Sequence, residues 1–190
     1  MLTPVQEYTN LVYDNYNTML LTFPVGVGII HNYFNAIINQ SERKKQTTLV
    51  LLRNYAVLNE TYRNFCQMVN YSDRINGINN FYEFENGSSV FFKLYNRVEH
   101  PIFKYADNVI FYDLEISKCN DLTLEMLSKI ADYDKKVFLN CNLKHNVERV
   151  LFKKSTDKKY KKDHKLNNLD SITSEIRRLK IKKIKAKCYE

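Results

Sequence analysis

Four short apolar runs constrain the possible folds of this chain more than any other feature of its sequence. They read TMLLTF at 18–23, TTLVLLR at 47–53, NVIFYD at 108–113 and KVFLN at 136–140. Short runs that stay apolar without strict alternation are typical of strands buried on both faces of a parallel sheet. Around and between them, apolar residues recur at helical spacing in segments 4–17, 29–38, 56–69 and 122–131. This alternation predicts an α/β fold, with a mostly parallel open sheet and helices on both of its faces.

Two turn signals refine this prediction. The segment 24–28 (PVGVG) holds two of the four glycines and lies between a predicted strand and a predicted helix, as in the first half of a βαβ unit. Farther along, Asn86 and Gly87 separate the apolar segments 81–84 and 89–92. An Asn-Gly pair between two such segments predicts a β-hairpin.

In this order the motifs resemble the ATPase domain of the large terminase subunit, the DNA-packaging motor of tailed bacteriophages. More loosely, they resemble helicase-type P-loop ATPases. The resemblance spans residues 2–145 and includes an N-G-S hairpin at 86–88, a Walker B strand at 108–113 and a coupling segment at 137–142. It implies a P-loop fold and a viral protein, and it makes nucleic acid or another viral protein the expected partner.

The same resemblance implies where a nucleotide site would lie. Gln6, in the motif L-x-P-x-Q, is similar to a glutamine of the family's leading helix that contacts adenine. Gly26 and Gly28 stand in the place of the phosphate loop, and Asp113 and Glu115 in the place of the Walker B acids.

The side chains that hydrolysis needs are missing from these positions. A phosphate loop supplies a lysine for the β- and γ-phosphates and a Ser or Thr for Mg²⁺. Ile29 and Ile30 stand in those places, and the first Lys or Arg of the chain is Arg43. Asp113 and Glu115 are also separated by Leu114, whereas the family has adjacent acids. Without these charges phosphoryl transfer loses its main electrostatic stabilisation. The sequence therefore predicts a degenerate nucleotide site, a pseudoenzyme and no cofactor.

The positive charge of the chain is concentrated at its C-terminal end. Residues 151–190 contain fourteen Lys or Arg and five acids, a net charge of +9, whereas residues 1–150 contain fifteen and sixteen, a net charge of −1. We expect an ATPase-like domain over 1–150, a lysine-rich mobile linker over 151–168 and a basic helix over 169–190. The residues expected to bind nucleic acid or another anion are Lys153, Lys154, Lys158, Lys159, Lys161, Lys162, Arg177, Arg178, Lys180, Lys182, Lys183, Lys185 and Lys187.

Such a basic helix has several possible roles. It can follow a phosphate backbone by counterion release, lie on an anionic membrane, seat its helical stripe on a partner, or pack on its own domain. The stripe consists of Ile172, Ile176, Leu179, Lys183 and Ile184. The leading hypothesis is a terminase-like protein that binds nucleic acid or a viral assembly. The alternative is a structural or host-interaction scaffold whose tail binds protein or anionic membrane.

Composition places further limits on function. The four cysteines and four histidines are scattered without the spacing of a zinc site. No apolar run approaches the roughly 18 residues of a membrane-spanning helix, and the N-terminus lacks a secretory pattern. We therefore expect an intracellular protein, in the host-cell cytoplasm or a nucleic-acid compartment, that is not secreted.

Overall fold

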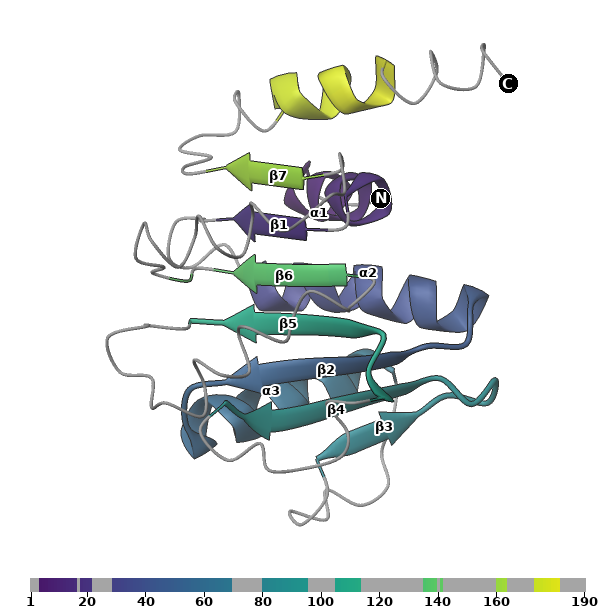
Figure 1. Ribbon diagram of the computed structural model, residues 1–190, viewed down its shortest axis with the longest axis vertical. Coiled ribbons are helices and arrows are strands. Elements are labelled where there is room, and N and C mark those ends of the chain that lie inside the picture. The colour runs from purple at the N-terminus through teal and green to yellow at the C-terminus, as the bar shows by residue number, and fades with distance from the viewer. Residues whose placement is uncertain are drawn as a thin grey trace.

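A computed structural model describes residues 4–16, 18–21, 29–69, 80–95, 105–113, 135–139, 141, 160–163 and 173–181. Within these residues the chain forms one seven-stranded sheet in the order β3-β4-β2-β5-β6-β1-β7 (Figure 1). The strands are β1 (Thr18–Leu21), β2 (Thr47–Leu52), β3 (Phe81–Glu83), β4 (Ser89–Leu94), β5 (Asn108–Tyr112), β6 (Lys135–Leu139) and β7 (Tyr160–Asp163). The helices are α1 (Pro4–Asn15), α2 (Ile29–Arg43), α3 (Tyr55–Met68) and a further helix at 173–181.

The sheet is parallel apart from one hairpin, so the predicted mostly parallel α/β fold is confirmed. β2 pairs in parallel with β4 and β5, and β6 pairs in parallel with β5 and β1. Only β3 runs antiparallel, against β4. The turn between them closes where expected, and Gly87 has a φ of 77°, a conformation that glycine adopts without steric cost.

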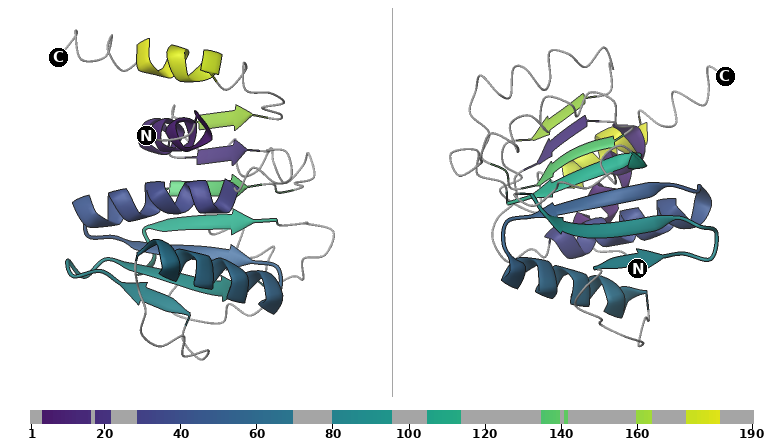
Figure 2. Two further views of the ribbon diagram at one scale, coloured as in Figure 1. Left: turned by 180° about the vertical axis from the view of Figure 1, so that it is seen from behind. Right: turned by 60° about the horizontal axis from the view of Figure 1, so that its bottom comes forward.

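The three helices α1, α2 and α3 lie on one face of the sheet (Figures 1 and 2). Aromatic rings fill much of the space between them and the strands. The Phe34 ring of α2 packs edge-to-face on Phe65 of α3 and on Phe92 of β4, with ring centroids 5.1 Å and 6.0 Å apart. Edge-to-face pairs of this kind stabilise a core beyond the apolar area that they bury. Helices on both faces of the sheet were expected, and the described helices α1, α2 and α3 bear out only one of them. The helix expected over 122–131 lies outside the described residues.

The opposite face of the central strands β2, β5 and β6 is also buried. Side chains that alternate with those facing the helices, such as Leu49 and Leu51 of β2, have no exposed surface. On the same face Phe111 of β5 stacks on Phe138 of β6 with centroids 5.1 Å apart and planes 4° from parallel. Burial on both faces is the reason that these strands are apolar at successive positions rather than at alternate ones.

Buried polar side chains tie the strands together at the amino edge of the sheet. The Ser88 hydroxyl accepts a hydrogen bond from the Gln46 backbone N–H (3.1 Å) and donates to the Ser41 carbonyl (2.8 Å). The Asn108 amide donates to the Gln46 side-chain oxygen (3.0 Å). These hydrogen bonds join the hairpin, β2, β5 and the end of α2. A buried polar group left without a partner costs about 1–3 kcal/mol, so separating these elements would destabilise the fold. The Asn-Gly-Ser motif therefore has a structural role in this chain.

Two described parts of the C-terminal segment, 160–163 and 173–181, pack against the rest of the fold. Residues 160–163 were expected to belong to a mobile linker, yet they form β7 and pair in parallel with β1. The helix at 173–181 (yellow in Figure 1) packs through Ile176 and Leu179 into the same core cluster as α1 residues Tyr8 and Val12. Leu179 has no exposed surface and Ile176 is 6% exposed. The apolar stripe of this helix is thus covered by its own domain.

Replacing Leu179 with alanine tests this docking. Because the side chain is fully buried, we expect Leu179→Ala to lower the free energy of unfolding by about 2–4 kcal/mol in urea titrations. Ile181 on the same helix is 47% exposed, and Ile181→Ala provides the matched control, with a change within about 0.5 kcal/mol. Equal, small effects of the two substitutions would contradict the packing of this helix on α1.

Candidate functional site

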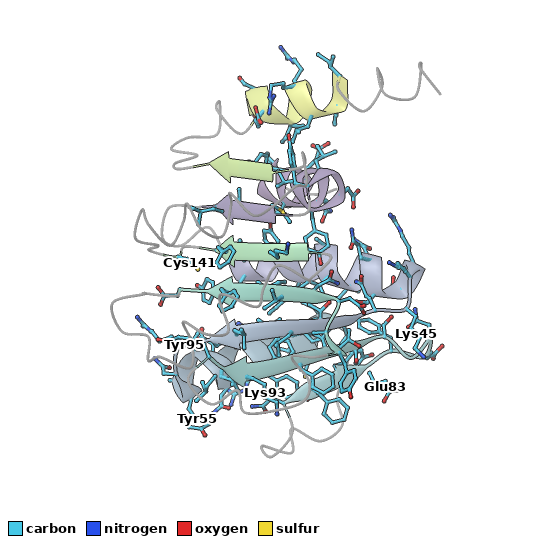
Figure 3. All side chains as sticks on the ribbon, viewed as in Figure 1. Lys45, Tyr55, Glu83, Lys93, Tyr95 and Cys141 are labelled. Carbon is cyan, nitrogen blue, oxygen red and sulfur yellow. The ribbon has the colours of Figure 1, made fainter. Side chains whose placement is uncertain are left out.

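The carboxyl edge of the sheet is the first candidate site. Because β2, β5, β6 and β1 are parallel, the residues that follow them emerge at one edge, where α/β proteins commonly bind ligands. Arg53 follows β2, Asp113 follows β5 and Cys141 lies just beyond β6. Figure 3 shows Tyr95 and Cys141 near this edge and Lys45 at the opposite one.

An ion pair dominates the described part of this edge. The Arg53 guanidinium lies 3.1 Å from the Asp113 carboxylate, and the two side chains are 45% and 41% exposed. The pairing follows from the strand register, in which Leu51 lies opposite Phe111. Two residues farther on, just beyond the ends of β2 and β5, Arg53 is therefore level with Asp113. The only acid of the predicted nucleotide site that lies within the described residues is therefore already neutralised by an arginine.

The backbone holds Asp113 in an unusual conformation. Its φ is 56°, in the left-handed region that side chains other than Asn, Asp and Gly rarely adopt. Its N–H donates to the Leu139 carbonyl of β6 at 2.9 Å, so the turn is fastened to the neighbouring strand. These contacts direct the chain out of the sheet immediately after β5.

Tyr112 and Cys141 also lie at this edge. Burial raises the pKa of the Tyr112 phenol, with smaller contributions from the carboxylates of Asp113 and Glu60, while Arg53 opposes the rise. The phenol therefore stays protonated at neutral pH. The Cys141 thiol is buried and lies 3.4 Å from the carbonyl oxygens of Phe111 and Leu139, to which it donates. Neither group is presented as a nucleophile or a base.

The other predicted nucleotide-site residues are not brought together in the described part of the chain. Gln6 lies in α1, and its side chain is outside the described residues, as are Gly26, Gly28 and Glu115. Arg53 is the residue of this edge whose role the sequence did not indicate. The sequence did offer one signal for it. Arg53 and Asp113 each come directly after a buried strand, and the ends of parallel strands meet at one edge of a sheet.

Metal and membrane sites were sought over the same ranges. No group of three or more His, Cys, Asp and Glu side chains is arranged to hold a metal ion among the residues described above. None of the helices in the described part of the chain has the length and hydrophobicity needed to cross a lipid bilayer.

The helix at 173–181 is the second candidate site. Its Arg177, Arg178 and Lys180 are exposed, whereas Ile176 and Leu179 are buried. Arg178 donates to both oxygens of Glu175, at 2.7 and 2.5 Å, and this bidentate bond is the main cause that raises the pKa of its guanidinium. Lys180 lies 2.5 Å from the Glu7 carboxylate of α1. The helix therefore presents cations that are oriented by the protein's own carboxylates.

Two more of the predicted anion-binding residues are placed by the sheet. Lys161 and Lys162 lie in β7, opposite Met19 and Leu20 of β1, and their side chains are not described. The rest of the predicted set falls outside the described ranges, namely Lys153, Lys154, Lys158, Lys159, Lys182, Lys183, Lys185 and Lys187.

Comparison with known proteins leaves the identity of the chain open. No protein-family model matches the sequence, and no curated protein matches it significantly.

The conformation of Asp113 yields a stability prediction. Asp113→Asn removes the charge but keeps a side chain that tolerates the left-handed region, so we expect a loss of at most about 1 kcal/mol. Asp113→Ala also loses that tolerance and should cost about 1 kcal/mol more. Urea unfolding of both variants measures the difference. If alanine is tolerated as well as asparagine, the left-handed conformation does not constrain this turn.

Proposed function

We propose that this chain is a catalytically inactive, terminase-like P-loop ATPase domain from a virus. In this proposal it acts by binding nucleic acid, alone or within a viral assembly, through its basic C-terminal segment. The observation that carries the binding function is the net charge of +9 on residues 151–190, against −1 on the rest of the chain.

The strand order is compatible with a P-loop ancestor. A nucleotide site of that kind needs the phosphate loop after one strand and the acidic residue after another to emerge at the same edge. β1, which precedes the glycine-containing segment 24–28, and β5, which precedes Asp113, are parallel and separated only by β6. A common edge for both motifs supports the resemblance.

The Arg53–Asp113 ion pair supports the loss of catalysis. A carboxylate that coordinates Mg²⁺ must be available to the metal, whereas Asp113 is 3.1 Å from a guanidinium. The sequence also lacks any Lys or Arg before Arg43, so no cation from the segment after β1 replaces the missing lysine. A fold can persist after its site has lost this chemistry, because packing and catalysis depend on different residues.

The basic segment provides a physical basis for binding. Lysine and arginine side chains that neutralise phosphates release condensed counterions, and this release gives affinity without sequence preference. Arg177, Arg178 and Lys180 are exposed on a helix that is anchored to the domain. An anchored helix offers its charges in a fixed arrangement, which lowers the entropy lost on binding.

ATP turnover tests the catalytic part of this proposal. We expect the purified full-length chain to show no Mg²⁺-dependent ATP hydrolysis above that of the Asp113→Ala variant, because the lysine and the free Walker B acid are both missing. Turnover by the wild-type chain that disappears in Asp113→Ala would contradict the assignment as a pseudoenzyme.

Salt-dependent DNA binding tests the other part. Because β7 and the helix at 173–181 belong to the fold, charge substitutions are preferable to a deletion of 151–190. We expect the triple variant Arg177→Gln, Lys182→Gln, Lys183→Gln to bind random-sequence duplex DNA at least about tenfold more weakly at 50 mM salt. The slope of log K against log salt should fall by roughly 0.9 for each lost contact. Fluorescence anisotropy measures both quantities.

A matched control exists on the surface of the same domain. Arg43, Lys44 and Lys45 form a second exposed run of three cations, at the end of α2. The triple variant of these residues to Gln carries the same charge change and should bind DNA nearly as wild type does. Equal losses in the two triple variants would refute a specific role of the C-terminal segment. Binding to anionic vesicles with none to DNA would instead support the scaffold alternative.

A further inference from the structure

The helix at 173–181 is held on α1 by two kinds of contact that differ in their sensitivity to anions. Ile176 and Leu179 are buried in the core and are indifferent to salt. The ion pair between Lys180 and Glu7 joins the same two helices at the surface, where Lys180 is 54% exposed and Glu7 is 36% exposed. An exposed pair of this kind exchanges partners readily, because water and salt screen it.

Two of the three exposed cations of this helix are paired with carboxylates of the protein. Lys180 is paired with Glu7, and Arg178 is paired with Glu175 through two hydrogen bonds. A phosphate group that binds either cation competes with a carboxylate that is already within hydrogen-bond distance. The negative charge of that carboxylate also repels the phosphate, so each pairing lowers the attraction of the helix for a phosphate backbone.

We propose that Glu7 and Glu175 are built-in competitors that limit the affinity of the basic helix for a phosphate backbone. This proposal rests on the proposed function and names how that surface is regulated. Loss of either carboxylate removes a competitor from its cation, while the buried contacts of Ile176 and Leu179 keep the helix in place. The competition weakens binding to arbitrary nucleic acid and makes the dependence of that binding on salt less steep.

The Glu7→Gln variant in the full-length chain tests the proposal. We expect it to bind random-sequence duplex DNA about two- to fivefold more tightly than wild type at 50 mM salt, the range given by an exposed ion pair. The slope of log K against log salt should become steeper by roughly 0.9, because one more cation contacts phosphate. Both quantities come from fluorescence anisotropy titrations between 50 and about 200 mM salt.

A matched control separates this effect from net charge. Glu83 is exposed on β3, at the far end of the sheet from β7 and the helix (Figures 1 and 3). Glu83→Gln makes the same chemical change there and should leave both the affinity and the slope close to wild type. In a Lys180→Gln background, Glu7→Gln should have no more effect than Glu83→Gln, since the cation that it would free is missing.

Glu175→Gln supplies a second, independent variant. It removes the carboxylate beside Arg178 and leaves the Lys180–Glu7 pair intact, so it remains informative if Glu7→Gln lowers the melting temperature of the protein. We expect a similar two- to fivefold gain in affinity.

The outcomes separate this inference from the proposed function. If wild type binds DNA with the expected salt dependence but Glu7→Gln and Glu175→Gln behave like Glu83→Gln, only the competition is refuted. If wild type does not bind DNA at 50 mM salt, the proposed function fails and this inference fails with it.

Discussion

The rest of the structure depends on the burial of β2 on both of its faces. Leu49, Val50, Leu51 and Leu52 have no exposed surface, so every peptide group of this strand must find its hydrogen bond within the sheet. Parallel pairing with β4 on one side and β5 on the other meets that requirement and sets both registers. A slip by one residue would exchange the side chains of the two faces, so the register is strongly specified.

The register of β2 determines which polar and charged side chains meet at each of its ends. At the amino edge it places Gln46 beside Ser88 and Asn108, which satisfy one another in a buried network. At the carboxyl edge it places Arg53 level with Asp113, and the two charges form an ion pair. The amino edge thus holds the sheet together through hydrogen bonds, whereas at the carboxyl edge the Asp113 carboxylate is paired with Arg53.

The C-terminal segment is held by the domain that precedes it. β7 extends the sheet beyond β1, and the helix at 173–181 buries Ile176 and Leu179 against α1. The cations of this helix therefore lie on a surface whose geometry is set by the core, rather than on a free tail. Carboxylates from α1 and from the helix itself orient two of them. A binding function for these residues is then a property of the whole fold, and stability and affinity must be measured together.

The sequence alone determined the features that depend on local pattern. Unbroken apolar runs predicted β2, β5 and β6 to within a residue or two, because burial on both faces demands apolar side chains at successive positions. The Asn86-Gly87 pair predicted the hairpin, since these residues tolerate the backbone of a tight turn. The absence of a lysine after β1 and the concentration of charge in residues 151–190 are likewise properties of the sequence itself.

Only the tertiary structure decided the features that join distant segments. Tyr160–Asp163 has no apolar pattern, and it becomes a strand because the edge of β1 offers its unpaired backbone groups. The stripe of Ile176 and Leu179 was visible in the sequence, but what covers it depends on α1, which lies at the opposite end of the chain. Arg53 and Asp113 are likewise sixty positions apart, and they meet because two parallel strands end level at one edge of the sheet. Local pattern specifies which segments are buried, whereas the partner of each segment depends on the packing of the whole chain.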